Sequence, residues 1–530
     1  MASARPLPRG ARTAAALLAA VGLLVAGCSV GPSQRPPVAV RGDTRAVPPA
    51  PDAAAPAPPD ALPDPQQQRP TIPFVDCTTD TISTLRTPPP ADRSLHMDCG
   101  ELTVAADPTS PTSQGLTLSV LRVSPTGAPA DRPPLLVVGD SAGESTARAA
   151  VLLALQVAPA LLEQYTLVGL DRRGAGAAAL NCSPDDARAA LVDADPSATS
   201  EKDLTSLLES ARDVVQECNI ALDGDIGTYR TAATAADIEP LRTALGVRTL
   251  SAIGFGDGAG ALSSWARTSP QAVGRLVLDG PQQPGLDQPD LGEAQAKAAE
   301  AAFSAFAVSC ATKPDCALGP DPRAAVMALV TALRSHPIAA PDGRRLTSGG
   351  ALLAVLWNLG EPTGWPALAT ALATARAGDP TPLLNSVDPV IGPHGRYDEM
   401  LATACNDTRS RLSPGQISTI AGHWRDAYPM FGATMALQLL DCAPWPTGGP
   451  VLAGGTAVGA PPLLVIGGAA DPRAPMDGAR RTADGLATAK FLSWQGAGSG
   501  AYPRTACVTG VVDAMLVQGV VPQSGTLCPP

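Results

Sequence analysis

The feature that most constrains the fold is the stretch 248–267, which reads RTLSAIGFGDGAGALSSWAR. Apolar residues lead up to Gly254, four glycines fall within the seven positions 254–260, and a run rich in Ala, Leu and Trp follows. This order predicts a β-strand, a turn packed too tightly for large side chains, and then a helix. Such a strand needs neighbouring strands and covering helices, because its apolar faces must be buried.

Other segments repeat this rhythm of strand and helix. Short continuous apolar runs, typical of strands buried on both faces, occupy residues 134–138, 165–170, 274–280 and 461–468. Residues 99–104 and 116–123 alternate in polarity in part, which predicts a hairpin. Helical patterns separate most of the apolar runs, so we predict an α/β protein with a mostly parallel sheet and helices on both faces.

The rhythm stops after Pro281. Residues 284–450 are Ala-rich, have helical patterns and contain no convincing buried strand. We therefore expect an inserted all-α cap domain, which divides the sheet domain into a first part at 74–283 and a last part at 451–530.

The N-terminus has the character of a targeting segment. Three arginines precede an apolar run at 13–27 that is too short to span a bilayer comfortably. Residues 24–28, LVAGC, resemble a bacterial lipobox, so we expect residues 1–28 to be a lipoprotein signal peptide with its lipid on Cys28. An ordinary cleaved signal peptide is the alternative. Both predict an extracytoplasmic protein; the first anchors it to the outer face of the cell membrane.

Residues 29–73 are dominated by Pro, Ala, Asp and Gln. Such a composition cannot bury enough apolar surface to offset the entropy of ordering, so we expect a disordered tether.

The cysteines point to disulfides. The chain has eleven cysteines, of which ten remain when Cys28 is set aside, and none of their spacings is C-x-x-C. An even number in an exported chain favours disulfides over a metal or redox site. Each neighbouring pair brackets one local unit, so we expect the pairs Cys77–Cys99, Cys182–Cys218, Cys310–Cys316, Cys405–Cys442 and Cys507–Cys528.

The charge balance and the histidine content argue against two kinds of partner, nucleic acid and metal ions. The chain carries 38 basic and 49 acidic residues, without a basic block, so nucleic acid is not an expected partner. Its four histidines are scattered, and we expect no metal site.

The turn itself resembles a known catalytic element. Residues 254–258, GFGDG, keep the glycine frame of the G-x-S-x-G nucleophile elbow, but Gly256 stands where the serine belongs. Further short motifs lie in a matching order, namely YTLVGLDRRG at 165–174, VLDG at 277–280, CND at 405–407, CAPWP at 442–446 and the region 463–475. Together, residues 99–528 resemble the secreted tripeptidyl aminopeptidases of actinobacteria, S33-type serine exopeptidases with the α/β-hydrolase fold.

This resemblance implies a Ser, Asp, His triad, and only one of its members is present. The family's serine falls on Gly256, its aspartate on Asp471, and its histidine on Ser499. No histidine follows His423 anywhere in the chain. Without a nucleophile and a general base the family's hydrolytic reaction cannot proceed. We therefore expect a pseudoenzyme that retains at most a ligand-binding or scaffolding function. The family implies no cofactor, and short peptides are the implied ligands. Asp471 should find a new donor in Ser499.

One complete G-x-S-x-G remains, GDSAG at 139–143. Taken alone it predicts an active serine hydrolase that uses Ser141, with His394 or His423 from the cap as base. In the family frame the same segment is the oxyanion loop, and the expected oxyanion residues are Gly139 and Asp140 of this loop together with Asp257 of the elbow turn. Both readings stay open at this point.

Two weaker hypotheses concern the central turn. Residues 254–259 formally match a dinucleotide-binding G-x-G-x-x-A, with Asp279 as the acidic partner. Alternatively, Asp257 could serve as a carboxylate nucleophile, which places bulky Phe255 at a position that requires a small residue.

Overall fold

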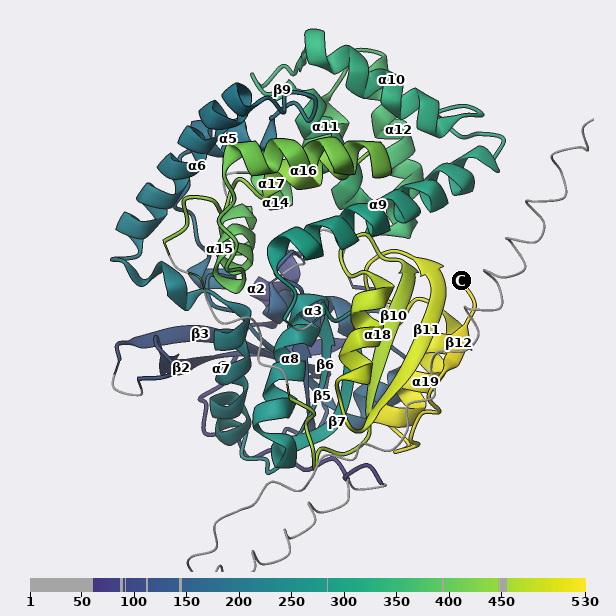
Figure 1. Ribbon diagram of the computed structural model, residues 1–530. Helices are drawn as coiled ribbons and strands as arrows, with labels where there is room; N and C mark the ends of the chain where they lie inside the picture. Colours follow the sequence, from purple (N-terminus) through teal and green to yellow (C-terminus); the bar gives the residue numbers. More distant parts are fainter. Residues whose placement is uncertain are drawn as a thin grey trace, which may run out of the picture. The chain divides into compact units, whose positions relative to one another are not determined.

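The computed structural model describes residues 61–530 with the exception of 86–88, 91, 111–112, 143–144, 284, 393–394, 447 and 449–454. The signal peptide at 1–28, the lipobox residue Cys28, residues 29–60 of the expected tether and His394 lie outside the described residues. Statements below concern the described part of the chain (Figure 1).

The described residues build a ten-stranded sheet in the order β1-β2-β3-β5-β4-β6-β7-β10-β11-β12. Strands β1, β2, β3 and β5 pair antiparallel, and every pair from β5 to β12 is parallel. The strands are β1 Val75–Asp76, β2 Leu95–Ala105, β3 Gly115–Pro125, β4 Pro134–Val138, β5 Thr166–Leu170, β6 Leu250–Phe255, β7 Val273–Asp279, β10 Leu463–Ala470, β11 Ala489–Ala497 and β12 Thr526–Cys528. Both the expected hairpin and the expected parallel sheet are confirmed.

Both faces of the sheet are covered, as continuous apolar strands require. In β4, for example, Leu135 and Val137 join the apolar cluster under α3, α4 and α19, while Leu136 and Val138 join the cluster under α7, α8 and α18. Figure 1 shows α7, α8 and α18 side by side over one face of the sheet. These helices are α3 Thr146–Ala154, α4 Pro159–Gln164, α7 Thr231–Ala244, α8 Asp257–Thr268, α18 Met476–Asp484 and α19 Ala506–Leu516. Short elements flank them, namely α2 Thr78–Ser83 and the 3-10 turns η1 Gly176–Ala178, η2 Asp225–Thr228 and η3 Pro270–Ala272.

The cap is inserted between β7 and β10 and has an apolar core of its own, with Phe303, Phe306 and Phe431 at its centre. It is mostly helical, but it also contains a two-stranded hairpin, β8 Ile338–Ala339 with β9 Arg345–Leu346. Its helices are α9 Gln288–Ala311, α10 Pro322–Ser335, α11 Ser348–Asn358, α12 Trp365–Arg376, α13 Thr381–Asn385, α14 Asp388–Ile391, α15 Tyr397–Asp407, α16 Pro414–Ala427 and α17 Gly432–Gln438, with the 3-10 turn η4 Pro362–Gly364.

A second segment joins the cap, which the expected domain boundary at 283/284 missed. Helices α5 Asp185–Val192 and α6 Glu201–Ala221 follow β5 in sequence, yet Leu204 and Leu208 of α6 belong to the apolar core of the cap. The α6 helix lies beside α16 (Figure 1). Helix α6 therefore completes the cap, because its apolar stripe finds its partner surface there rather than on the sheet.

The tether ends earlier than its composition predicts. Residues 61–73 run along the sheet domain, where the amides of Arg69 and Thr71 donate to the carbonyls of Leu245 and Ala244 at the end of α7. The Ile72 side chain enters the apolar core. The expectation of disorder up to residue 73 is thus wrong for 61–73, because the exposed carbonyls of a helix end provide partners that composition does not reveal.

Five disulfides are present, Cys77–Cys99, Cys182–Cys218, Cys310–Cys316, Cys405–Cys442 and Cys507–Cys528. They are the sequential pairs that were expected. Disulfides form and persist in oxidising compartments, so they indicate an extracytoplasmic protein. Among the described residues, every helix is too short or too polar to cross a membrane.

Candidate functional site

The glycine turn at the end of β6 has the geometry of a nucleophile elbow. Gly256 lies between β6 and α8 with φ 56° and ψ −125°, a conformation that side chains rarely adopt. Its neighbours must also be small. A Cβ on Gly254 would lie 2.7 Å from Leu262 Cδ1, and one on Gly258 would lie 2.4 Å from the carbonyl oxygen of Gly139. The glycine frame is therefore required by the packing.

The space in front of Gly256 is occupied by Asp140. A Cβ placed on Gly256 would lie 1.6 Å from Asp140 Oδ2 and 2.6 Å from its Cγ. Asp140 follows β4, whose neighbour in the sheet is β6. Burial and the negative charge of Asp257 raise the pKa of the Asp140 carboxyl. A carboxyl group thus stands where the side chain of the nucleophile would be attached, a role for Asp140 that the sequence did not suggest.

The expected oxyanion loop is bound to Asp257. The Ser141 amide donates to Asp257 Oδ1 at 2.9 Å, and Ser141 Oγ donates to Asp257 Oδ2 at 2.5 Å. The buried guanidinium of Arg172 forms a salt bridge with the same carboxylate. This amide of the loop therefore already has an anionic acceptor inside the protein.

Ser141 itself lines the cavity described below, but none of the described histidines is its partner. His423 is exposed on α16, and His394 lies outside the described residues. The two groups that its hydroxyl and amide contact are both oxygens of Asp257. Asp257 is in turn held by Arg172 and Ser141, so its carboxylate does not point freely into the cavity as a nucleophile would.

The other end of the expected triad is also rearranged. Ser499 Oγ donates to Asp471 Oδ1 at 3.0 Å, as expected from the sequence. The backbone amides of Arg473 and Ala474 donate to the same oxygen at 3.0 and 3.1 Å. Burial raises the pKa of Asp471, and these donors oppose the rise. Asp471 is therefore satisfied by hydrogen bonds without an imidazole.

The side chain of Arg473 lies next to Ser499, which sequence reasoning did not foresee. Its Nε donates to Ser499 Oγ at 3.1 Å and its Nη1 to the Ala142 carbonyl at 3.4 Å. The guanidinium also lies over the ring of Trp357 from the cap, 5.5 Å from the ring centre. Arg473 thus connects the position of the missing histidine, the oxyanion loop and the cap.

The cap closes over the same position. The Ser499 amide donates to the Gly360 carbonyl at 2.8 Å, and a Cβ on Gly360 would lie 3.1 Å from Ser499 Oγ. Arg504 forms a salt bridge with Glu361 beside it. A larger side chain at position 499 would have to displace this loop of the cap or turn into the cavity.

A cavity of about 290 Å³ lies between the sheet domain and the cap. Asp140, Ser141 and Arg473 line it from the sheet domain, and Trp357 and Asp441 line it from the cap. A second cavity of about 80 Å³ adjoins it inside the cap and is mostly apolar. Six lining residues are common to the two cavities, Leu353, Trp357, Tyr397, Met400, Gln438 and Asp441.

Acidic groups gather at the cap side of the larger cavity. Removal from bulk water raises the pKa of Asp441 to about 7 and that of Asp407 to about 6. The Asp441 carboxylate has the Tyr397 hydroxyl as a donor at 3.5 Å. Nearby, burial raises the pKa of Glu399 to about 8 although the charge of Arg172 opposes the rise. Buried carboxylates are costly to ionise without a partner, so a cation bound in this part of the cavity would be stabilised by pairing with them.

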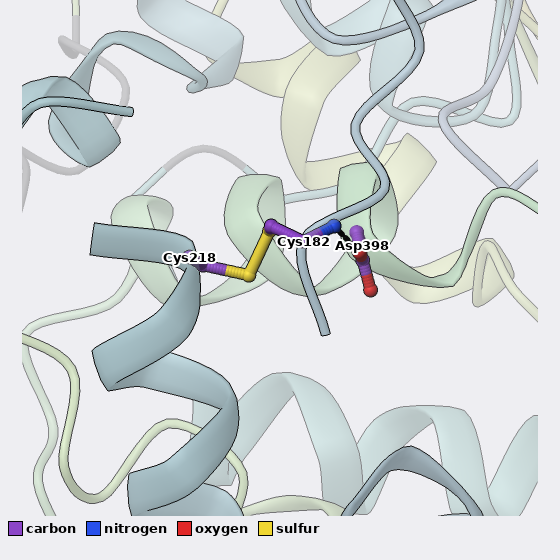
Figure 2. Close-up of side chains that lie close together, drawn as sticks. All are labelled: Cys182, Cys218 and Asp398. Carbon is purple, nitrogen blue, oxygen red and sulfur yellow. Dashed lines mark hydrogen bonds between the residues drawn. A yellow bond between two sulfur atoms is a disulfide. The ribbon is translucent and has the colours of Figure 1, made fainter. Parts of the chain in front are cut away.

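Cys182, Cys218 and Asp398 lie close together, but they do not form a metal centre (Figure 2). The two sulfurs are joined in a disulfide and offer no thiolate. Asp398 instead accepts hydrogen bonds from the amides of Cys182 and Ser183, at 2.6 and 2.9 Å. The carboxylate therefore fastens this loop to α15.

The dinucleotide hypothesis fails on Asp279. Its buried carboxylate accepts the amides of Ala501 and Tyr502, both at 2.8 Å, within the loop that follows β11. A ribose could not reach it. The approach to Gly256 that a pyrophosphate would need is occupied by Asp140.

Comparisons with known proteins agree with this architecture. Residues 428–528 match the family model described as TAP-like protein. The serine protease Hip1 of Mycobacterium tuberculosis is 27% identical over 458 residues, which cover 81% of this chain and 87% of that protein. Carboxylesterase B of the same organism is 26% identical over 460 residues, covering 82% and 86%. The tripeptidyl aminopeptidase of Streptomyces coelicolor is 28% identical over 198 residues, 36% of each chain.

Among solved structures, a proline iminopeptidase of Mycobacterium smegmatis is similar at a TM-score of 0.34 and 14% identity, covering 79% of this chain and 98% of that one. The strand order and the elbow at Gly256 are those of an α/β-hydrolase fold. The chain has this fold with a C-terminal region that matches the TAP-like family model, and it is similar over most of its length to a serine protease and a carboxylesterase.

Proposed function

We propose that this chain is a lipid-anchored member of the family that has lost hydrolysis and keeps the cavity between sheet domain and cap as a binding site for short peptides. The observation that carries the proposal is the position of Asp140 Oδ2, 1.6 Å from where a Cβ at Gly256 would stand. A serine that had merely been exchanged for glycine would leave an open space. Here a carboxyl group from another loop fills that space.

The residues at the positions of the nucleophile, the base and the oxyanion hole cannot perform acyl transfer. Gly256 offers no nucleophile, and Ser499 offers no group that takes up a proton at neutral pH. The Ser141 amide donates to a carboxylate, where an oxyanion would need a free donor. In a comparable triad, loss of the nucleophile or of the base lowers turnover by about 10⁶-fold.

The cavity favours binding as the function that is left. Its volume of about 290 Å³ is at the lower end of ligand pockets, which start near 300 Å³. Its lining combines apolar side chains with many polar and charged ones, which could orient a small ligand. The names of the relatives, serine protease and tripeptidyl aminopeptidase, favour peptides as the class of ligand.

Membrane attachment rests on the lipobox at 24–28 and on the disulfides, which favour an exported chain. Labelling with an alkyne-bearing fatty acid in cells, followed by detection on the mature protein, tests it. A Cys28→Ser variant is the control. Lipid label on the variant as strong as on the wild type would contradict attachment at Cys28.

An active hydrolase that uses Ser141 is the second candidate, because Ser141 lines the cavity and its hydroxyl bonds to a carboxylate. Turnover of a chromogenic tripeptide amide separates the two candidates. The proposal expects turnover no higher in the wild type than in Ser141→Ala, together with a rise in melting temperature when short peptides are added. Turnover that disappears in Ser141→Ala would establish the second candidate.

A further inference from the structure

The smaller cavity, here called the inner cavity, lies within the cap and carries a set of polar groups of its own. We propose that it binds a primary carboxamide on a short aliphatic arm, as in an asparagine or glutamine side chain, through Thr434, Gln438 and Asp441. The inference rests on the proposed function in one respect, because a peptide held in the larger cavity is the ligand that would carry this side chain.

The three polar side chains come from one face of α17 and the turn that follows it. Thr434 and Gln438 are four residues apart on the helix, a spacing that places them on the same face. The Asp441 amide donates to the Gln438 carbonyl at 3.3 Å, so the chain continues in a 3-10 turn that stacks Asp441 on Gln438. All three residues line the inner cavity. The segment TMALQLLD at 434–441 therefore forms a polar stripe on this wall.

The Thr434 hydroxyl is the group that calls for a ligand. Thr434 is only 9% exposed, and its Oγ1 has no hydrogen-bond partner within the part of the chain that the structure describes. Buried hydroxyls are otherwise nearly always hydrogen-bonded, because removal from water without a new partner is costly. A polar group that enters the inner cavity and bonds to Thr434 would offset that cost.

The rest of the lining is mostly apolar. Leu191, Leu207, Leu353, Val390 and Ile391 contribute to it from four other helices, α5, α6, α11 and α14. Asp441 is the one charged side chain among the described residues that line the inner cavity. A ligand carboxylate would thus meet a negative charge and no positive one, whereas an uncharged group on an aliphatic arm suits both kinds of surface.

A primary carboxamide matches the three polar groups better than a hydroxyl or an ammonium does. Its oxygen accepts hydrogen bonds and its nitrogen donates two. It can therefore accept from the Thr434 hydroxyl while its nitrogen donates to Gln438 Oε1 and to Asp441. A hydroxyl has a single proton to donate, and an ammonium has no acceptor for the protons of Thr434 and Gln438.

The protonation of Asp441 favours the same group. Burial raises the pKa of this carboxyl to about 7, so both of its forms are present at neutral pH. A carboxamide pairs with either form, because it donates to a carboxylate and accepts from a carboxylic acid. An ammonium pairs well only with the ionised form.

The size and position of the inner cavity fit a side chain that enters from the larger one. Its volume of about 80 Å³ is roughly half of the 150 Å³ of an engineered cavity that binds benzene, so it has room for a carboxamide with one or two methylene groups. Trp357, Tyr397 and Met400 line both cavities. A ligand whose body lies in the larger cavity can thus extend an arm past them.

Ligand-observed NMR titration of the mature chain with three small probes tests the proposal at neutral pH. The probes are propionamide, 2-butanone, which has a methyl group in place of the amide nitrogen, and propionate. The wild type should bind propionamide about tenfold or more tightly than either of the other two, because only propionamide satisfies all three polar groups.

Thr434→Val keeps the shape of the side chain and removes its hydroxyl. It should weaken propionamide binding by about fivefold or more and leave 2-butanone within about twofold. The melting temperature of the ligand-free variant should equal or exceed that of the wild type, because an unpartnered buried hydroxyl has been replaced, and this measurement also shows that the variant folds. Thr370→Val, at an exposed position of α12, is the matched control and should keep the preference of the wild type.

Three results would overturn the carboxamide site, namely no saturable binding of propionamide, equal affinity of the wild type for propionamide and either other probe, or an unchanged preference in Thr434→Val. Because Thr434 lines the inner cavity and not the larger one, the last comparison also locates the bound probe. If short peptides raise the melting temperature and propionamide does not bind, the site is refuted and the proposed function stands. Propionamide binding without any effect of peptides would refute the proposed function instead.

Discussion

Asp140 Oδ2 occupies the space that a side chain on Gly256 would need, at 1.6 Å from an ideal Cβ. The missing serine and the aspartate of the neighbouring loop are therefore two parts of one arrangement. A serine at position 256 would therefore clash with Asp140 unless the aspartate moved. The backbone conformation of Gly256, with φ at 56°, is a second obstacle to a side chain at this position, because residues other than glycine are strained there.

Gly256→Ser should lower the free energy of unfolding by about 2 to 4 kcal/mol, from backbone strain and from the clash with Asp140. The double variant Gly256→Ser/Asp140→Ala should recover about 1 to 2 kcal/mol of that loss, because the clash is removed and the strain is not. Urea unfolding of the wild type, both single variants and the double variant measures the coupling. Effects of the two substitutions that simply add would contradict the arrangement.

Ser499 has a structural part in place of a catalytic one. Its hydroxyl donates to Asp471 and accepts from Arg473. Ser499→Ala should destabilise the fold by about 1 kcal/mol, since a buried carboxylate loses one of its donors. Ser304→Ala, at an exposed position of α9 where the hydroxyl donates to the Glu300 carbonyl and accepts from Arg323, should stay within about 0.5 kcal/mol of the wild type. Thermal or urea unfolding distinguishes them, and equal effects of the two would be a contradiction.

Stability should fall as the pH rises from about 4.5 to about 8, and Glu399 should account for part of the fall. The pKa of Glu399 is raised from 4.5 to about 8 by burial, with Asp257 and Asp171 adding to the rise and Arg172 and Arg396 opposing it. The folded state thus binds more protons than the unfolded state between these pH values, so the free energy of unfolding declines with pH.

Glu399→Gln stays neutral at every pH and should remove this part of the decline. We expect the variant to exceed the wild type in stability at pH 8 by about 1 kcal/mol or more, and to lose that advantage near pH 4.5. Urea unfolding across this range measures both curves. Parallel curves for the wild type and the variant would show that Glu399 does not titrate there.

Much of this fold follows from local pattern. The glycine spacing at 254, 256 and 258 predicts the elbow because each position lies too close to the backbone or side chains of its neighbours to hold a Cβ. The bond between Ser499 and Asp471 follows from the family frame, since a buried carboxylate needs donors and the hydroxyl stands where a donor stood.

The features that the sequence did not reveal depend on contacts between distant segments. Asp140 is expected only as a residue of the oxyanion loop, and its contact with the elbow becomes visible when β4 and β6 are placed side by side. The sequence assigns no role to Arg473, whose side chain the structure places between Ser499 and Trp357. Helix α6 and residues 61–73 likewise find partners far along the chain, which no local periodicity can indicate.

The loss of hydrolysis is tested most directly by a fluorophosphonate probe on the purified mature chain, with mass spectrometry of the labelled peptides and an active serine protease as positive control. The account predicts no adduct on any serine of the wild type under conditions that label the control completely. An adduct on Ser141 that disappears in Ser141→Ala, accompanied by turnover of a tripeptide amide, would show that the chain is a working hydrolase.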